Sequence, residues 1–363
     1  MFLQTNLKDI ACQFVLAGDV EQIAPLGNGL INDTYRVSTA GDAPDYVLQR
    51  VNTGIFTDID LLQSNIEAVT HHLHDRLLRD GVDDIDRRVL QFVPTPMGKT
   101  YHRDGDGNCW RMSVFIEGSH TVDEVNTHTA QDAGRAFGNF ECMLTDLPQH
   151  LGEPIPDFHN MELRARQLND AVSTDPVGRV DGVRDILVPL MADLHAMCLA
   201  ERLYRQGVLP KRVCHCDTKV NNMLLDDDGS VLCVIDLDTV MPSFVFSDFG
   251  DFLRTAANEV AEDCSDLTRV RFRENIFEAF TTGYLDATRP FLTQVERDYL
   301  PYAVQLFPFM QCVRFITDYI NGDTYYKIQY PDHNLVRARN QLAFYHQVCR
   351  HMPMMRATIT RCG

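Results

Sequence analysis

The sequence predicts an α+β fold of two lobes, a small lobe with an antiparallel sheet and a larger, mainly helical lobe. The first hundred or so residues alternate short strand-like runs with turns. Beyond Thr121, almost every segment has the apolar spacing of an amphipathic helix. The chain has 363 residues, more than one ordinary core needs, so we expect lobes at 1–117 and 118–363 that meet at a hinge at Glu117-Gly118.

Five strands and one helix are predicted for the small lobe. The helix spans 58–79, where Ile59, Leu62 and Ile66 begin a series of apolar residues at helical spacing. Strand-like runs precede and follow it, and turns that contain glycine, such as Gly41-Asp42, bound them. The strands are expected at 20–25, 31–38, 46–51, 89–92 and 110–116.

Seven helices and one β-hairpin are predicted for the large lobe. Helical periodicity is interrupted only at 213–238, which has the pattern of a loop, a strand, a turn and a second strand. The helices are expected at 130–144, 160–171, 181–205, 251–260, 270–285, 295–320 and 335–350.

The chain is strongly acidic, with 51 acidic against 33 basic residues and a formal net charge of -18. Such a chain has little attraction for phosphate backbones or anionic membranes, and no basic stripe is present. The N-terminal residues MFLQTNLKDIACQF lack the features of a signal peptide, and no apolar run approaches the length of a membrane span. We therefore expect a cytoplasmic protein without a nucleic-acid or membrane partner.

The hairpin at 223–235 indicates a site for a divalent cation. Its two apolar runs are joined by Asp226-Asp227-Asp228-Gly229, an Asp-Gly turn that fixes the pairing of the strands. This register brings Asn222, before the first strand, beside Asp236, after the second. A carboxylate and an amide oxygen at one end of a hairpin are ligands that suit Mg²⁺ together with substrate phosphates.

Asp217 lies five residues before Asn222, close enough to face the same point without being a metal ligand. Phosphoryl transfer needs such a separate carboxylate to orient the attacking hydroxyl and accept its proton. Lys219 follows two residues later, where its ammonium could reach the transferred phosphate. A single Asp in a turn is more often only solvated, so the prediction depends on the whole pattern.

The pattern His215-x-Asp217-x-x-x-x-Asn222, followed by Asp236 at the end of a hairpin, resembles the catalytic and metal-binding loops of protein kinases and of their aminoglycoside phosphotransferase and choline kinase relatives. The resemblance implies a protein kinase-like fold that uses ATP and Mg²⁺. It also assigns His215 a supporting role.

The tripeptide Asp248-Phe249-Gly250 has the letters of the kinase metal motif but not its position. Asp236 lies 19 positions after Asp217, room for one short hairpin, whereas Asp248 lies 31 positions after it. We therefore expect Asp236 to be the metal ligand. Asp248 matches a second Asp of the small-molecule kinases, which implies that it supports the catalytic loop through backbone hydrogen bonds.

Further stretches are similar to one branch of these kinases, the bacterial N-acetylhexosamine 1-kinases. The most specific are IDLDTVMP and YPDHNLVR, and the likeness runs from about Gly27 to Arg339. It implies ATP-dependent phosphorylation of the anomeric hydroxyl of N-acetylglucosamine or N-acetylgalactosamine, with the small sugar and ATP as partners. It also points to Arg314 and Tyr325 as sugar-binding residues; the alternative for both is helix packing with a buried salt bridge to Asp318.

The nucleotide side of the site is assigned to the small lobe. Gly27-Asn28-Gly29 would form the flap over the ATP phosphates, although a lone G-x-G is usually only a hairpin turn. Gln49 occupies the strand position where kinases place a Lys, with Arg50 beside it, which leaves open an ion pair to Glu67. Phe115, after the last predicted strand, is assigned to the nucleotide as well.

Two other functions fit the same residues. A kinase for an amino alcohol or an aminoglycoside would suit the acidic surface, because such substrates are cationic. A catalytically inactive kinase-like binding module is suggested by the missing strand Lys, but His215, Asp217, Asn222 and Asp236 are all present.

Overall fold

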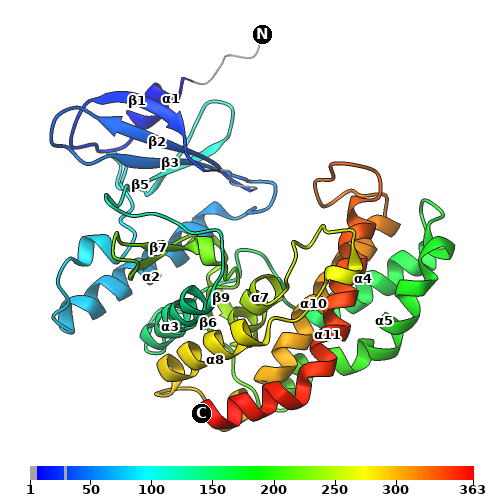
Figure 1. Ribbon diagram of the computed structural model, residues 1–363. Helices are drawn as coiled ribbons and strands as arrows, with labels where there is room; N and C mark the ends of the chain where they lie inside the picture. The colour runs from blue at the N-terminus through cyan, green and yellow to red at the C-terminus, as the bar shows by residue number, and fades with distance from the viewer. Residues whose placement is uncertain (1–5, 28–30) are drawn as a thin grey trace. The chain divides into compact units, whose positions relative to one another are not determined.

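The structure is a computed structural model that describes residues 6–27 and 31–363. It divides into two compact units, which Figure 1 shows. Unit 1 comprises residues 1–121, 146–156 and 223–241, and unit 2 comprises 122–145, 157–222 and 242–363. Unit 1 contains an antiparallel sheet and unit 2 is mainly helical, which confirms the predicted α+β class. Among the described helices, none is both long enough and apolar enough to cross a bilayer.

Unit 1 is built on a five-stranded antiparallel sheet in the order β1-β2-β3-β5-β4. The first and third strands have the predicted bounds, and the second is displaced by one or two residues from its prediction. The strands are β1 Val20–Pro25, β2 Asp33–Thr39, β3 Tyr46–Val51, β4 Tyr101–Arg103 and β5 Cys109–Val114.

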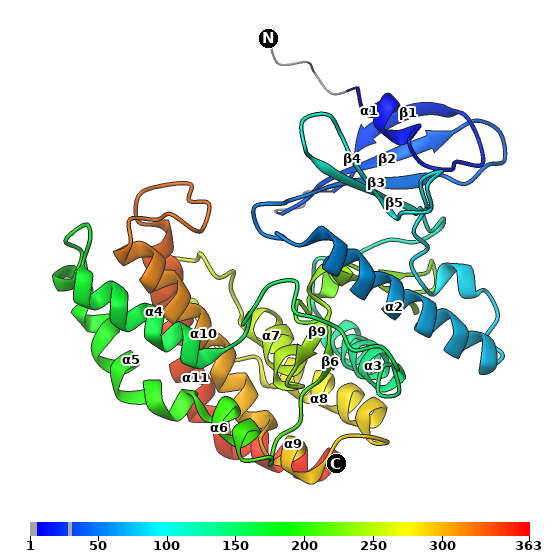
Figure 2. The same cartoon turned by 180° about the vertical axis from the view of Figure 1, so that it is seen from behind.

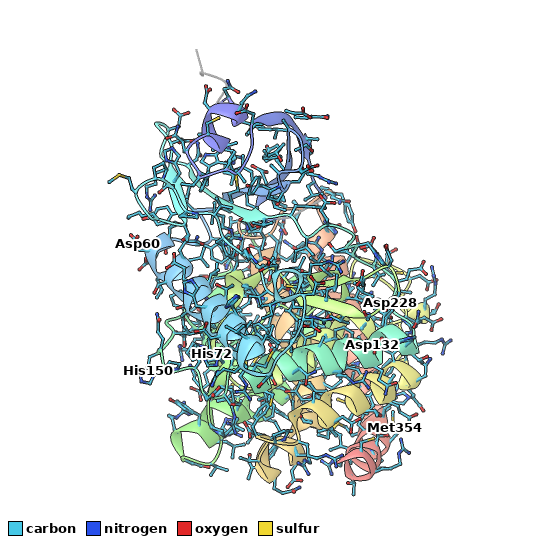
Figure 3. The ribbon with its side chains drawn as sticks, turned by 90° about the vertical axis from the view of Figure 1, so that its left-hand side faces the viewer. Asp60, His72, Asp132, His150, Asp228 and Met354 are labelled. Atoms are coloured by element: carbon cyan, nitrogen blue, oxygen red, sulfur yellow. The ribbon has the colours of Figure 1, made fainter. Side chains whose placement is uncertain are left out.

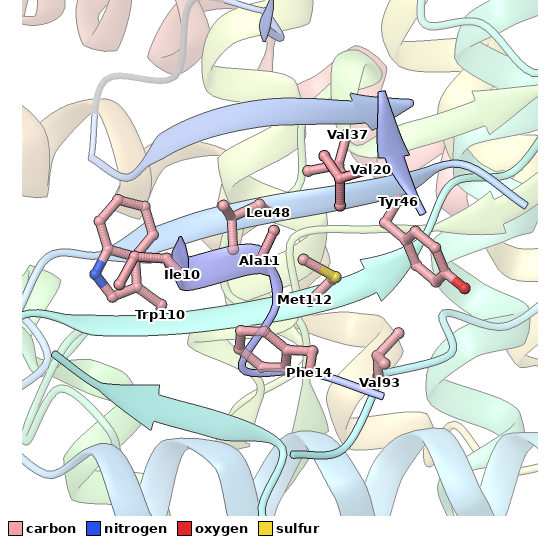
Figure 4. Close-up of a cluster of buried hydrophobic side chains, with 10 residues drawn as sticks. All are labelled: Ile10, Ala11, Phe14, Val20, Val37, Tyr46, Leu48, Val93, Trp110 and Met112. Atoms are coloured by element: carbon pink, nitrogen blue, oxygen red, sulfur yellow. The ribbon is translucent and has the colours of Figure 1, made fainter. Parts of the chain in front are cut away.

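A cluster of apolar side chains covers one face of this sheet (Figure 4). Helix α1, Leu7–Ala11, contributes Ile10 and Ala11, which pack against strand residues that alternate along β3 and β5. Leu48 and Met112 lie at the centre and are fully buried. The alternation of inward side chains fixes the register of both strands, because a slip by one residue would expose this face.

Helix α2, Ile59–Arg79, follows β3 and agrees with its prediction. The Asp58 carboxylate accepts the N–H of Leu61 at 2.9 Å and caps the helix. Its apolar stripe is buried from Ile59 to Leu73. Figure 3 labels Asp60 near the start of this helix and His72 in its second half. The helix contacts the edge of the sheet, where the Tyr101 hydroxyl of β4 donates to the Asp60 carboxylate at 2.6 Å.

The predicted hairpin consists of β7, Met223–Leu225, and β8, Val231–Val234, and it belongs to unit 1. Arg87 donates to the carboxylate of Asp226 at 3.0 and 3.1 Å. The backbones of His120 and Leu225 exchange two hydrogen bonds. Ile116, Leu232 and Cys233 form a small apolar core between these segments. Residues more than 100 positions apart in sequence therefore hold the hairpin to the first part of the chain.

The predicted strand at 89–92 is wrong. Only Phe92 forms an isolated bridge there, to Ser113, and Pro94 and Pro96 follow at once. Proline cannot donate to a ladder, so the segment cannot continue as a strand. The edge strand is β4 instead, whose three residues are too few for a periodic pattern to be recognised.

Unit 2 is mainly helical, and in Figures 1 and 2 its two longest helices, α10 and α11, run side by side. Helices α3 and α8 also pack closely against one another. The helices are α3 Thr127–Met143, α4 Met161–Thr174, α5 Arg184–Met197, α6 Leu199–Arg205, α7 Phe246–Ala256, α8 Glu274–Thr288, α9 Gln294–Asp298, α10 Leu300–Ile320 and α11 His333–Cys362, with two short strands, β6 Arg212–Cys214 and β9 Met241–Ser243.

Four helix predictions need correction, and one of them, at 335–350, ends too early because α11 continues to Cys362. The helix expected at 181–205 is divided into α5 and α6 because the Tyr302 hydroxyl donates to the Met197 carbonyl at 2.7 Å and takes the place of a helical bond. The helix expected at 295–320 is divided into α9 and α10, which meet at Tyr299. Helix α7 begins at Phe246 and not at Asp251, so that the segment SDFGD is helical.

The contact between α3 and α8 depends on glycines. A Cβ atom on Gly283 would lie 2.0 Å from the carbonyl oxygen of Gln131, and one on Gly134 would lie 2.2 Å from that of Phe280. Neither backbone can move without separating the helices. We expect Gly283→Ala to lower the free energy of unfolding by about 1 to 3 kcal/mol or more, as measured by denaturant titration, because the contact is already close-packed.

Gly182→Ala is the matched control in the same unit. Its Cβ would meet no atom within 4 Å and its φ is not positive, so its unfolding free energy should change by less than about 0.5 kcal/mol. Equal stability of the two variants would contradict the close packing of α3 and α8.

Candidate active site

The loop between β6 and β7 carries the residues that the sequence assigned to catalysis. Cys216 has a left-handed backbone, with φ of 63°, which is unusual for a residue other than glycine. The Asp248 carboxylate accepts the N–H groups of His215 and Cys216 at 2.8 and 2.7 Å. The Thr218 hydroxyl donates to the Asp248 carbonyl at 2.8 Å. Asp248 therefore fixes this unusual turn through hydrogen bonds with the backbone and with Thr218.

The structure brings Asp217, Lys219 and Asn222 together. The Lys219 ammonium lies 2.6 Å from a carboxylate oxygen of Asp217. The Asn222 amide donates to the Asp217 carbonyl at 2.7 Å and, at 3.4 Å, to its carboxylate. Burial lowers the pKa of Lys219, but the neighbouring Asp217 and Asp251 raise it more, so this pKa lies above its usual value. Asp217 thus faces a stable positive charge.

Asp251 and Arg254 of α7 were not predicted from the sequence as neighbours of this loop. Arg254 forms ion pairs with Asp251 at 3.0 Å and with Glu262 at 2.8 Å. Asp251 is buried and close enough to Asp217 and Lys219 to influence the pKa of the latter. In the sequence, only the three-residue spacing of Asp251 and Arg254 could have indicated their ion pair.

His215 is buried in an aromatic environment. Its ring packs edge-on against Phe137 and Phe140 of α3, with ring centroids 5.5 and 5.8 Å away. The N–H of Asp217 donates to its Nδ1 at 3.3 Å. His215 therefore connects the helical core to Asp217, two residues later in the loop.

The tripeptide Asp248-Phe249-Gly250 lies in the first half of α7, and all three residues are buried. The Phe249 ring packs against Tyr284 of α8 with centroids 5.1 Å apart. A Cβ on Gly250 would lie 2.6 Å from the carbonyl oxygen of Ala303 in α10. The tripeptide thus forms part of the helical core.

Asp236 follows the hairpin in unit 1. Met223 pairs with Val234, and the chain then turns at Asp236, whose backbone is left-handed with φ of 60°. Asp238, two residues later, accepts the Asn32 side-chain N–H at 2.8 Å and forms a buried ion pair with Arg111. The turn that contains Asp236 is therefore fixed to the sheet.

Gln49 lies in β3 at the position where protein kinases carry a Lys. Its side-chain oxygen accepts from Arg111 Nε of β5 at 3.0 Å, and Arg111 is only 3% exposed. Arg50 points away and pairs with Asp33 at the surface. The Glu67 carboxylate accepts the Thr100 hydroxyl and pairs with no described cation. The buried cation beside Gln49 is thus Arg111, which sequence reasoning missed.

The other residues assigned to the nucleotide lie in unit 1. Gly27 has φ of 70° and open space around its Cα, as a chain reversal requires. Asn28 and Gly29 lie outside the described residues. Phe115 follows β5, and the Arg36 guanidinium lies 4.1 Å from its ring centroid.

Arg314 and Tyr325, the predicted sugar-binding residues, are neighbours in unit 2. The Arg314 guanidinium lies 6.0 Å from the Tyr325 ring centroid and 5.5 Å from that of Tyr326. The proposed salt bridge of Arg314 with Asp318 is not formed. Asp318 instead accepts three backbone N–H groups, of residues 324–326, at 2.8 to 2.9 Å, and so fixes the loop that carries Tyr325. Tyr325 itself is 63% exposed.

A second arginine, Arg164 of α4, lies beside this cluster and was not predicted. It donates to the Phe158 carbonyl at 2.7 Å, and the Phe158 ring lies 5.6 Å from the Arg314 guanidinium. Burial, and then the charge of Arg314, lower the pKa of Arg164 to about 10. The same two causes lower the pKa of His159 well below its usual value. Within the described ranges, no carboxylate forms an ion pair with either guanidinium.

Comparisons with known proteins identify the family and the fold. A sequence model of the phosphotransferase enzyme family matches residues 22–292. An aminoglycoside phosphotransferase from Alicyclobacillus acidocaldarius superposes with a TM-score of 0.63 at 14% identity, over 99% of this chain and 98% of its own. A choline/ethanolamine kinase family protein from Mesorhizobium loti gives 0.52 at 16% identity, over 94% of each chain.

A spectinomycin phosphotransferase solved with ADP and spectinomycin gives a TM-score of 0.54 at 12% identity, over 98% of this chain and 99% of its own. At such identities the likenesses concern the fold alone. They confirm the protein kinase-like fold that the motifs implied.

Proposed function

This chain belongs to the phosphotransferase enzyme family, and from this membership we propose that it is an ATP-dependent kinase that phosphorylates the anomeric C1 hydroxyl of an N-acetylhexosamine. The observation that carries the kinase part of the proposal is the catalytic loop, in which Asp217 is held beside Lys219 and Asn222. Such an arrangement offers a fixed carboxylate to a substrate hydroxyl, which phosphoryl transfer requires.

ATP is the proposed phosphoryl donor, by analogy with the spectinomycin phosphotransferase that was solved with ADP. We assign its binding to Gly27, Asn28 and Gly29 of the flap, with Gln49 and Phe115. Arg111 extends this assignment. It is the buried cation hydrogen-bonded to Gln49, and its charge can replace that of the strand Lys which other kinases use near the phosphates.

Asn222 and Asp236 have the donor chemistry for Mg²⁺. The Asn222 amide donates its N–H to Asp217, which leaves its carbonyl oxygen to serve as a cation ligand. Asp236 supplies a carboxylate two residues after Val234, the strand partner of Met223. Hard oxygen donors of this kind suit Mg²⁺, which when bound neutralises charge on the nucleotide phosphates.

Asp217 is proposed to orient the C1 hydroxyl and to accept its proton as the oxygen forms a bond to the γ-phosphorus. The bond from phosphorus to ADP breaks in the same displacement, so that the products are the sugar 1-phosphate and ADP. Lys219 balances the charge of Asp217 before the substrates bind. Orientation of the hydroxyl contributes more than basicity, because an anomeric hydroxyl is more acidic than an ordinary alcohol.

The choice of acceptor rests on the arginine cluster as well as on the motifs IDLDTVMP and YPDHNLVR. Arg164 and Arg314 would repel an ammonium group, as carried by choline or an aminoglycoside. Guanidinium groups instead donate to hydroxyl and carbonyl oxygens, such as those of a sugar and its acetamido group. The exposed Tyr325 beside them offers a ring on which a sugar can stack.

A kinase for a cationic small molecule is the second candidate. It is favoured by the net charge of -18 and by the names of the aminoglycoside and choline/ethanolamine kinases that share the fold. The two candidates differ in the charge that the acceptor site must accommodate, and turnover with a panel of acceptors separates them.

We expect N-acetylglucosamine or N-acetylgalactosamine to release ADP from ATP, whereas choline, ethanolamine and aminoglycosides should not. The 1-O-methyl glycoside should be inert because it lacks the attacking hydroxyl, and a 6-deoxy sugar should still react. Phosphorus NMR should show coupling of the product phosphate to the anomeric proton.

Three outcomes of this panel would contradict the proposal. Phosphate on C6 would contradict the proposed orientation of the sugar. Turnover with amines alone would establish the second candidate. Absence of ATP consumption with every acceptor would favour an inactive binding module.

A further inference from the structure

A second buried carboxyl, Glu141 of α3, lies beneath the catalytic loop next to Asp248. Glu141 is 2% exposed and Asp248 is fully buried. Their carboxyl groups and the thiol of Cys214 have ligand atoms within 4.8 Å of one another. The loop prediction did not use Glu141, because it precedes Asp248 by more than 100 residues in sequence.

Two carboxylates this close in a buried environment cannot both be charged at modest cost, so one of them holds a proton. The hydrogen bonds decide which one. Asp248 accepts two backbone N–H groups, which favour its charged form. Glu141 accepts one hydroxyl, from Tyr284 to Oε2 at 2.6 Å, and its buried Oε1 has no donor among the residues that the structure describes. The proton therefore belongs on Glu141.

We propose that Glu141 is a positioning residue of the active site, a protonated carboxyl that donates a hydrogen bond to Asp248 and thereby fixes the loop that presents Asp217. Tyr284 orients the Glu141 carboxyl from the opposite side. The resulting chain of hydrogen bonds runs from Tyr284 of α8 through Glu141 of α3 and Asp248 of α7 to the backbone of the loop. The inference rests on the proposed function in one respect, that Asp217 acts on the acceptor hydroxyl.

The electrostatics of the surroundings are consistent with this assignment. Burial, and then the charge of Asp248, raise the pKa of Glu141 well above its usual value. Burial likewise raises the pKa of both Cys214 and Cys216, so the neighbouring thiols are neutral. The titratable and charged groups that face the pair are Cys214, His215, Cys216, Tyr284, Glu296 and Arg212.

The same three ligand atoms do not form a convincing cation site. Three of the four carboxyl oxygens already accept hydrogen bonds, from His215, Cys216 and Tyr284. A thiol must also lose its proton to bind a metal, and that of Cys214 is held neutral by burial. A proton satisfies the pair without further ligands.

The kinetic test compares Glu141→Ala with Glu141→Gln. The Ala variant loses the donor to Asp248, so the loop shifts, and turnover should fall by about 10- to 100-fold, the usual cost of a small misplacement of a catalytic group. KM for ATP and for the acceptor should change by less than about three-fold, since Glu141 is buried and is not proposed to contact either substrate. The Gln amide donates in the same place, so this variant should regain turnover to within about three-fold of the wild type.

Glu201 provides the matched control. It is a buried glutamate of unit 2 on α6, but it accepts the N–H of Met161 and not a group of the catalytic loop. Glu201→Ala should lower the melting temperature and leave turnover within about three-fold of the wild type. If Glu141→Ala likewise lowered only the melting temperature and kept its turnover, Glu141 would be merely structural and the proposal would be overturned. A Glu141→Gln variant no more active than Glu141→Ala would also overturn it.

The pH dependence of melting tests the buried pair without any substrate. A protonated Glu141 means that the folded state binds one proton more than the unfolded state above the usual Glu value of 4.5. Stability therefore falls as the pH rises towards the raised folded pKa. Glu141→Gln removes this contribution, so its melting temperature relative to the wild type should increase with pH. If the difference in melting temperature between the two proteins did not change with pH, the shared proton would be overturned, whatever the acceptor molecule proves to be. This test does not need the Glu141→Ala variant to fold.

Discussion

Replacing Asp217 by Asn should leave a folded protein that still binds ATP and the acceptor but turns over about 10² to 10⁴ times more slowly, the range expected for a positioned acid-base group. Asn has the same shape and can keep the hydrogen bond with Asn222, but it cannot take the proton of the attacking hydroxyl. It also removes the ion pair with Lys219, which lies 2.6 Å away. Turnover measured at saturating substrate, with binding followed by calorimetry, isolates the chemical step.

Asp181→Asn is the control for this change. Asp181 lies in the same unit, its side chain is 86% exposed, and its ion pair with Arg184 is a surface contact. Its turnover should equal that of the wild type, because exposed pairs contribute little. If a folded Asp217→Asn protein kept near-normal turnover, Asp217 could not be the catalytic base.

The two aspartates after the hairpin should give different defects. Asp236→Ala should abolish activity, because it removes a proposed metal ligand. Asp248→Ala should lower the free energy of unfolding by about 1 to 3 kcal/mol for each of the two backbone N–H groups left unpaired. Those groups belong to His215 and Cys216, and Asp248 is fully buried. Activity as a function of Mg²⁺ concentration and thermal melting measure the two effects separately.

The backbone at Asp236 calls for one further variant. Its φ of 60° is tolerated by Asp and Asn but costs energy for Ala. Asp236→Asn should therefore be inactive while keeping the melting temperature of the wild type. A fully folded Asp248→Ala protein whose Mg²⁺ requirement had disappeared would instead place the metal at the DFG tripeptide.

Local sequence patterns predicted the parts of the site that are close in the chain. The hairpin follows from an Asp-Gly turn between two apolar runs, and the loop from the spacing of Asp217 and Asn222. Both need only a few neighbouring residues. The distinction of Asp236 from Asp248 followed from the length of the hairpin. The Asp248 carboxylate accepts backbone N–H groups of the loop, and the supporting role assigned to it stays a prediction.

Distant partners explain what the sequence did not show. Arg111 in the strand CWRMSV is informative only once Asp238, more than 100 positions later, is seen beside it. Arg164 and Glu141 lie in ordinary amphipathic helices, where a charged residue normally faces water. The break between α5 and α6, at Cys198, could not be predicted either, because it depends on the Tyr302 hydroxyl of α10.

The helical setting of Asp248-Phe249-Gly250 has a consequence for inhibitor discovery. In protein kinases the packing of the DFG Phe distinguishes active from inactive states, so a compound can exploit a displaced Phe. Here Phe249 is fully buried between helices, and Gly250 lies directly against the backbone of α10. Moving the ring would require part of the helical core to unfold. Compounds that bind kinases with a rotated DFG should therefore find no matching pocket in this protein. A selective ligand is better sought at Arg164 and Arg314, the proposed acceptor site.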